Sequence, residues 1–252
     1  MLSVFCAPSR YVQGRDATLD LGHQMTHLGL SGPALVVATP RVVRLLGESW
    51  QSAFAQADMA YQVHDFGGEC SQDQIDAGLA AARSAGAGVI VGAGGGKALD
   101  TARAVASELS LPVVNCPTLA SSDAPCSALS VVYTDDGTFD RLIFYPRNPD
   151  LVLVDTSLVA AAPRRFLVSG MGDALATWYE ARTVIEAHQP NQLGGATTIA
   201  GGALAELCCH TLYADGLAAA IDVDAGAVTP ALERIVEANT LLSGLGFESG
   251  GL

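Results

Sequence analysis

Apolar residues in the first half of the chain occur in short runs or in alternation with polar residues. Residues 34–38 and 151–154 are uninterrupted apolar runs, 61–66 alternates, and the run 89–91 enters a cluster of glycines. Uninterrupted runs of this length are typical of strands that are buried on both faces. The pattern predicts strands over 34–38, 61–66, 89–91, 111–116, 128–133, 139–145 and 151–154.

Segments of helical length separate the first of these strands. Pro40 precedes a helical segment that begins at Arg41, and proline is favoured in the first turn of a helix. Ser71 is a good N-cap for a helix from Gln72 to about Ala85. Strands that alternate with helices in this way predict βαβ units and a mostly parallel sheet.

The pattern changes in the middle of the chain. The dipeptide Asp136-Gly137 in the short connection between 128–133 and 139–145 predicts a β-hairpin. From Pro163 onward no segment has strand character. Helices are predicted there over 164–185, 201–213 and 230–242. We therefore expect an α/β domain over 1–162, Rossmann-like with a mostly parallel sheet, followed by an all-helical domain over 163–252.

Composition narrows the classes of function. The chain has 252 residues, 50% of them hydrophobic, and a net charge of −13. That charge argues against non-specific binding of nucleic acid or of an anionic membrane surface. We expect no membrane span and no secretory leader. The six cysteines form no C-x-x-C pair, so we expect reduced thiols and a cytoplasmic location.

The glycine cluster after 89–91 is the main candidate for binding a ligand. Gly94-Gly95-Gly96 is followed by Lys97, which is the only lysine of the chain, and then by a helix. A strand, a glycine turn and a helix N-terminus together present backbone N–H groups to a phosphate. The spacing fits neither a Walker A loop nor the G-x-G-x-x-G turn. The alternative is a glycine turn that only lets a helix pack closely on the sheet.

Two further segments carry candidate polar residues. The stretch 117–127 follows the end of a strand, where open α/β sheets bind ligands, and contains Asp123 among four hydroxyl side chains. The alternative for this stretch is a helix-capping loop. Asp173 is an acid early in an otherwise apolar helix and could be a metal ligand in a cleft between the domains. The alternative for Asp173 is compensation of the helix dipole.

Other reactive side chains give weaker signals. His23 and His27 could share a helix face, but no glutamate completes an H-E-x-x-H zinc site. Cys208-Cys209-His210 lies in an apolar, helical segment and is predicted to belong to the core. The G-x-S-x-G turn of many serine hydrolases does not occur.

Several runs of residues share one resemblance. They are 67–72, 94–102, 117–133, 148–150, 172–177, 229–234 and 243–252. Together they resemble the iron-containing (group III) alcohol dehydrogenase family, and within it the enzymes that oxidise glycerol. The likeness covers essentially the whole chain. It implies oxidation of glycerol to dihydroxyacetone with NAD as hydride acceptor and a divalent metal, usually Zn²⁺. It also implies a homo-oligomer that acts on a small polyol.

The resemblance also implies roles for single residues. Gly95, Gly96 and Lys97 would hold the pyrophosphate of NAD. Asp123 would contact glycerol, and Asp173 would be the first metal ligand. The residues expected to line the dinucleotide and the nicotinamide are Thr118, Ser121, Ser127, Leu129 and Tyr133.

The chain departs from the family pattern in two places. The two histidine ligands that the family carries after the Gly-Phe-Glu-Ser-Gly-Gly run are not among these residues. We therefore expect a chain that is truncated at its C-terminus, with only part of the helical metal and substrate domain over 163–252. Because zinc takes about four ligands, we expect weak or no metal-dependent turnover from this polypeptide alone. Thr39 stands where the family commonly has an aspartate that accepts the ribose 2′-OH, with Arg41 nearby. We therefore expect looser discrimination between NAD and NADP.

Two other functions stay open at this point. A relative could act on another polyol, on a glycerol phosphate or in a lyase reaction, although 117–127 has none of the basic residues that a phosphorylated substrate would want. A different class is a non-catalytic, nucleotide-binding or oligomer-forming remnant. Such a protein would bind the cofactor without turnover, even with added zinc.

Overall fold

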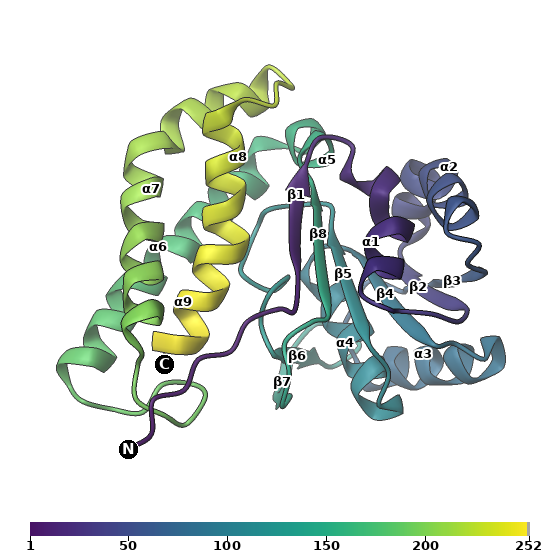
Figure 1. Ribbon diagram of the computed structural model, residues 1–252, viewed down its shortest axis with the longest axis horizontal. Coiled ribbons are helices and arrows are strands. Elements are labelled where there is room, and N and C mark those ends of the chain that lie inside the picture. The colour runs from purple at the N-terminus through teal and green to yellow at the C-terminus, as the bar shows by residue number, and fades with distance from the viewer. Residues whose placement is uncertain (251–252) are drawn as a thin grey trace. The chain divides into compact units, whose positions relative to one another are not determined.

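The computed structural model describes residues 1–250, which divide into two compact units (Figure 1). The α/β unit comprises Ser9–Thr118 and Ala128–Asp155. The helical unit comprises Met1–Pro8, Leu119–Ser127 and the chain from Thr156 onward. The chain therefore passes between the units several times, whereas the sequence predicts a single division near residue 162.

A six-stranded sheet forms the centre of the α/β unit. Its order is β1-β8-β5-β4-β2-β3, and all neighbouring strands are parallel. Every residue of β2, β4, β5 and β8 is buried, which explains why these strands are apolar without alternation. The predicted parallel sheet is confirmed, but the edge strand β1 was not predicted. The strands are β1 (Tyr11–Gly14), β2 (Ala34–Ala38), β3 (Tyr61–Asp65), β4 (Val89–Gly94), β5 (Val113–Pro117) and β8 (Leu151–Asp155).

Helices cover both faces of this sheet, with α1 and α2 on one side and α3 and α4 on the other (Figure 1). The Thr39 hydroxyl accepts a hydrogen bond from the Val42 N–H at the start of α2, and the Ser71 hydroxyl accepts one from Gln74 at the start of α3. Both predicted helix starts are therefore confirmed. The helices are the 3-10 turn η1 (Ala17–Asp20), α1 (Leu21–His27), α2 (Pro40–Gln56), α3 (Gln72–Ala85) and α4 (Gly96–Leu109).

The predicted hairpin is also present, as the antiparallel strands β6 (Leu129–Tyr133) and β7 (Phe139–Phe144). Its turn closes with a hydrogen bond from the Gly137 N–H to the Thr134 carbonyl. The positive φ of 84° at Gly137 explains why glycine is favoured at this position of the turn.

A buried ion pair attaches the hairpin to α4. Arg103 donates to the Asp100 carboxylate at 2.9 Å and to the carbonyl of Leu129. The same carboxylate accepts the Val131 N–H at 3.2 Å, and the Ser130 hydroxyl donates to the Asp100 carbonyl at 2.8 Å. Burial raises the pKa of Asp100 to about 6, and the Arg103 guanidinium opposes this shift. Each of these two buried charges is therefore stabilised by the other.

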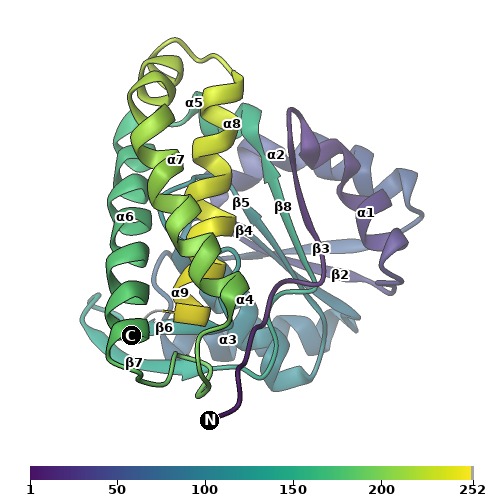
Figure 2. The same cartoon turned by 60° about the vertical axis from the view of Figure 1, so that its left-hand side comes forward.

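The helical unit is confirmed as strand-free from Pro163 to residue 250, apart from an isolated bridge between Ser3 and Ala196. Helices α6 and α7 run alongside a third rod, in which α8, the π turn η2 and α9 follow one another end to end (Figure 2). The predicted helix 201–213 is longer than expected, and the predicted helix 230–242 contains a π-helical turn. The helices are α5 (Thr156–Ala161), α6 (Arg164–Glu186), α7 (Ile199–Asp224), α8 (Pro230–Glu237), the π turn η2 (Ala238–Leu242) and α9 (Ser243–Gly250).

Helix α7 is apolar on several sides. Cys208 and Ala219 on one side are fully buried, while Leu217 is 80% exposed and Ile221 60% exposed on another. A helix that is apolar all round is normally covered on every side by protein or lipid. No helix within residues 1–250 is long and apolar enough to span a membrane.

The buried pair of Asp100 and Arg103 gives a prediction on stability. The substitution Asp100→Asn leaves the Arg103 charge buried without its carboxylate, so the free energy of unfolding should fall by about 3 kcal/mol. Glu108→Gln is the matched control, because Glu108 lies exposed on the same helix. Urea unfolding of both variants measures the difference. Equal free energies of unfolding would show that the pair does not anchor the hairpin.

Candidate functional site

The glycine cluster forms the turn between β4 and α4, as predicted. A Cβ atom on Gly92 would lie 2.8 Å from the Ala102 Cβ, and one on Gly94 would lie 3.1 Å from the Ala98 Cβ. These two glycines therefore allow α4 to pack closely on the sheet, which was the alternative considered for the whole cluster. Gly95 and Gly96 lie further along, at the start of α4, and both are half-buried.

Gly95 is the N-cap residue of α4, and no side chain caps the helix there. The first N–H groups of an α-helix have no partners within the helix. At the start of α4 they point away from the helix at the edge of the sheet where the parallel strands end. This is the arrangement that binds phosphate groups in many proteins. The glycine turn therefore fits the pyrophosphate of a dinucleotide.

Lys97, in the first turn of α4, makes two contacts. Its Nζ lies 2.6 Å from both carboxylate oxygens of Glu69 and 4.9 Å from the centroid of the Tyr133 ring. The structure therefore brings Lys97 and Tyr133 together, as expected for residues of one site. Glu69 was not predicted, although it follows the end of a strand, as polar site residues often do.

The other predicted residues of the α/β unit lie in different surroundings. Thr118 is buried directly after β5, and its N–H donates to the Gly94 carbonyl at 3.0 Å, so it adjoins the glycine turn. Thr39 follows β2, whose last residue Ala38 pairs with Ala93, and its hydroxyl caps α2. Leu129 begins β6, and its carbonyl accepts the hydrogen bond from Arg103 described above.

The remaining predicted residues belong to the helical unit. Helix α6 begins at Arg164, so Asp173 lies well beyond its first turn. Because the dipole effect falls off within the first turn, the dipole interpretation of Asp173 is wrong. One of its carboxylate oxygens accepts the Asp123 N–H at 3.0 Å. Burial raises the pKa of Asp173, and this hydrogen bond opposes the shift.

The backbone N–H of Asp123 therefore lies next to the Asp173 carboxylate. Ser121 and Ser127 belong to the same loop as Asp123. Ser121 is half-buried, whereas Ser127 is 3% exposed and its hydroxyl donates to the Ala124 carbonyl at 3.4 Å. The loop 119–127 contains no strand or helix. The N-cap residues of α6, α7 and α8 all lie outside this loop, so the capping alternative gains no support from these helices.

Asn239 holds this loop in place, and sequence analysis missed it. It is fully buried in the π turn, and its side-chain NH₂ donates to the carbonyls of Ala120 at 2.9 Å and Leu167 at 3.1 Å. Its Oδ1 has no hydrogen-bond partner within residues 1–250. The only sequence signal was a polar residue inside an apolar helical pattern. π turns often occur at functional sites.

Two glycines allow the loop to approach the helices. A Cβ on Gly170 of α6 would lie 2.1 Å from the Ala120 carbonyl oxygen and 2.5 Å from the Asn239 amide nitrogen. A Cβ on Gly244 of α9 would lie 2.8 Å from the Cβ of Cys126. The loop that carries Asp123 is therefore packed against α6 and α9 where they lack side chains.

The part of the chain that the structure describes does not contain a complete set of ligands for a metal ion. Within residues 1–250, no three histidine, cysteine, aspartate or glutamate side chains form a group that could hold a metal. Asp173 supplies one carboxylate. Cys208 is buried in the core, as predicted, and burial raises the pKa of its thiol to about 12. His210 on α7 is exposed, so the prediction that it belongs to the core is wrong, and it is not part of such a group within residues 1–250.

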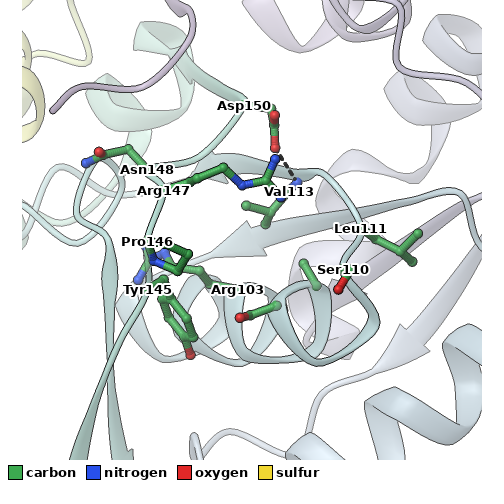
Figure 3. A pocket seen from close by; sticks show the side chains of 11 residues that line it. Arg103, Ser110, Leu111, Val113, Tyr145, Pro146, Arg147, Asn148 and Asp150 are labelled. Atoms are coloured by element: carbon green, nitrogen blue, oxygen red, sulfur yellow. Dashed lines mark hydrogen bonds between the residues drawn. The ribbon is translucent and has the colours of Figure 1, made fainter.

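A cavity of about 140 Å³ lies at the other edge of the sheet, where the strands begin (Figure 3). Val113 and Asp150 line it, and the Asp150 carboxylate accepts the Val113 N–H at 2.9 Å. The last turn of α4 also lines it, with Ser107 and Ser110. Arg103 and Arg147 line the cavity as well, so its charges are mixed. Small-molecule sites are usually larger than roughly 300 Å³, so the size of this cavity does not favour a dinucleotide.

A parallel sheet with helices on both faces and a glycine turn at the start of a helix defines the Rossmann-like class of α/β folds. The family model described as iron-containing alcohol dehydrogenase matches residues 8–156. This chain belongs to the iron-containing alcohol dehydrogenase family, which confirms the expected family and its oxidoreductase class.

Individual relatives agree with this placement. The chain is 52% identical over 255 residues to a glycerol dehydrogenase of Thermotoga maritima, a match that covers 100% of this chain and 68% of that protein. It is 48% identical to a glycolaldehyde reductase of Halobacterium salinarum, with 100% and 68% covered. The solved structure of a probable glycerol dehydrogenase from Sinorhizobium meliloti 1021 has a TM-score of 0.93 and 43% identity, with 99% and 68% covered. The chain thus spans about two thirds of the length of these relatives.

The close approach at Gly170 gives a second prediction. The substitution Gly170→Ala puts a methyl group into the Ala120 carbonyl, so we expect a loss of more than about 2 kcal/mol of unfolding free energy. Hydrogen exchange of residues 119–127 should also accelerate. Gly172→Ala is the matched control on the same helix, because a Cβ there meets nothing within 4 Å. It should be neutral or stabilising by up to about 1 kcal/mol. Similar behaviour of both variants would contradict the packing described here.

Proposed function

We propose that this chain provides the cofactor-binding part of an NAD-dependent dehydrogenase that oxidises glycerol to dihydroxyacetone. The observation that carries the proposal is the glycine turn, where Gly95 opens α4 without a side-chain cap. The identity of 52% to a glycerol dehydrogenase supports the substrate. NAD, when bound, supplies the acceptor for a hydride from the alcohol carbon.

The residues of this chain would bind and orient the two reactants. Gly95 and Gly96 would donate backbone N–H groups to the pyrophosphate, and Lys97 would add a charged donor. Asp123 would accept hydrogen bonds from the hydroxyl groups of the polyol. We further propose Thr39, Thr118, Ser121, Ser127, Leu129 and Tyr133 as residues that line the cofactor.

We propose no reaction step at a metal ion. Asp173 would be one ligand of the family's metal, but the residues described here supply no group of three ligands. Asp173 instead accepts a hydrogen bond from the Asp123 backbone, so its present role is to fix the loop that carries Asp123. We also propose that the chain forms a homo-oligomer, because an interface between copies would bury the exposed apolar side chains of α7.

Glycolaldehyde is a second candidate substrate. One relative with 48% identity is a glycolaldehyde reductase, whose name points to a small hydroxyaldehyde rather than a polyol. Both compounds carry adjacent oxygen functions that one aspartate could bind. Formation of NADH from NAD and glycerol would indicate oxidation of glycerol, and consumption of NADH with glycolaldehyde would indicate reduction of glycolaldehyde. Binding of NAD without either reaction would indicate a non-catalytic nucleotide-binding protein.

Binding of NAD tests the role of the glycine turn. Wild-type chain should bind NAD in a calorimetric titration, and Lys97→Met should raise the Kd by about tenfold, because a charged donor to the pyrophosphate is lost. Arg83→Met is the matched control, since Arg83 is an exposed cation in the last turn of α3. An unchanged Kd for Lys97→Met would remove Lys97 from the site.

Thr39 gives a prediction on cofactor choice. Thr39→Asp preserves an N-cap for α2, because aspartate caps helices as well as threonine does. It also places a carboxylate where a 2′-phosphate would lie, so the ratio of Kd for NADP to Kd for NAD should rise about tenfold. Titration of both cofactors into wild type and variant measures the ratio. A strong preference of the wild type for NAD would show that Thr39 does not relax discrimination.

A further inference from the structure

Glu69 lies in a tightly organised turn between β3 and α3. The Gly67 N–H donates to the Gln74 side chain at 2.7 Å, and Gly68 has a φ of 110°, which favours glycine. Two residues after Glu69, the Ser71 hydroxyl caps α3. The backbone that carries Glu69 is thus fixed on both sides.

The Glu69 carboxylate is directed at Lys97. Both of its oxygens lie 2.6 Å from the Lys97 Nζ, so the whole carboxylate faces the ammonium group. The ammonium also lies over the Tyr133 ring, 4.9 Å from its centroid. The Lys97 side chain is 44% exposed and that of Glu69 31% exposed, so the pair is open to solvent and to a ligand.

This ion pair changes what the glycine turn offers to a phosphate. Lys97 is the only lysine of the chain, and its charge is cancelled by Glu69. A pyrophosphate that approaches the start of α4 therefore finds neutral N–H groups and an ammonium whose charge is already paired with a carboxylate. To receive a hydrogen bond from Lys97, the phosphate has to take the place of a Glu69 oxygen or lie beside a carboxylate of like charge.

We infer that Glu69 sets the affinity of the glycine turn for the cofactor by competing with the pyrophosphate for Lys97. This inference rests on the proposed function. Glu69 makes binding weaker than the loop alone would allow, which favours release of the cofactor after each turnover. It also makes binding less sensitive to salt, because the net charge beside the pyrophosphate is close to zero.

The test compares wild type with Glu69→Gln, Lys97→Met and the double variant, each titrated with NAD at low and high ionic strength. Glu69→Gln should lower the Kd for NAD about fivefold, the effect of removing one charge a few ångströms away in a solvated site. Its Kd should also rise more steeply with salt than that of the wild type. The gain should be smaller in the Lys97→Met background, where no ammonium is left to release.

Asp73→Asn is the matched control, because Asp73 is an exposed acid at the start of α3 and its loss changes the net charge equally. It should leave the Kd unchanged. An unchanged or higher Kd for Glu69→Gln would overturn the inference, as would an equal gain with and without Lys97. If none of the proteins binds NAD, the proposed function fails as well. Binding by the wild type without the expected differences contradicts the inference alone.

Discussion

Helix α4 lies so close to strand β4 that neither Gly92 nor Gly94 has room for a side chain without displacing its neighbours. This close approach fixes where α4 begins and which way its first N–H groups point. The same helix anchors the β6–β7 hairpin through Asp100 and Arg103, and strand β6 ends with Tyr133 next to Lys97. The position of the glycine turn therefore depends on packing that involves β4, α4 and the β6–β7 hairpin.

Local patterns were sufficient to predict most of the α/β unit. Apolar runs predicted the buried strands, Ser71 predicted the start of α3, and Asp136-Gly137 predicted the hairpin. Each of these signals acts within a few residues. The edge strand β1 was missed because its four residues are half-buried and show no alternation, so it forms only by pairing with β8.

Contacts between distant parts of the chain could not be predicted. Glu69 contacts Lys97 across 28 positions, and Asn239 contacts Ala120 across 119. No spacing rule connects such residues, since the fold alone brings them together. Asp173 was identified by a resemblance. The dipole alternative failed because α6 begins at Arg164, as the sequence also predicts, so Asp173 lies beyond the first turn of the helix. The role of Gly170 likewise follows from a distance, not from a motif.

The central claim is that the start of α4 binds the pyrophosphate of NAD. Titration of NAD into isotopically labelled chain, followed by amide NMR, tests it most directly. The account predicts saturable shifts of the Gly95, Gly96 and Lys97 amide signals, with little change for amides at the other edge of the sheet, such as that of Val113. Saturable shifts centred on Val113 and its surroundings, with the signals of Gly95 to Lys97 unmoved, would contradict the claim.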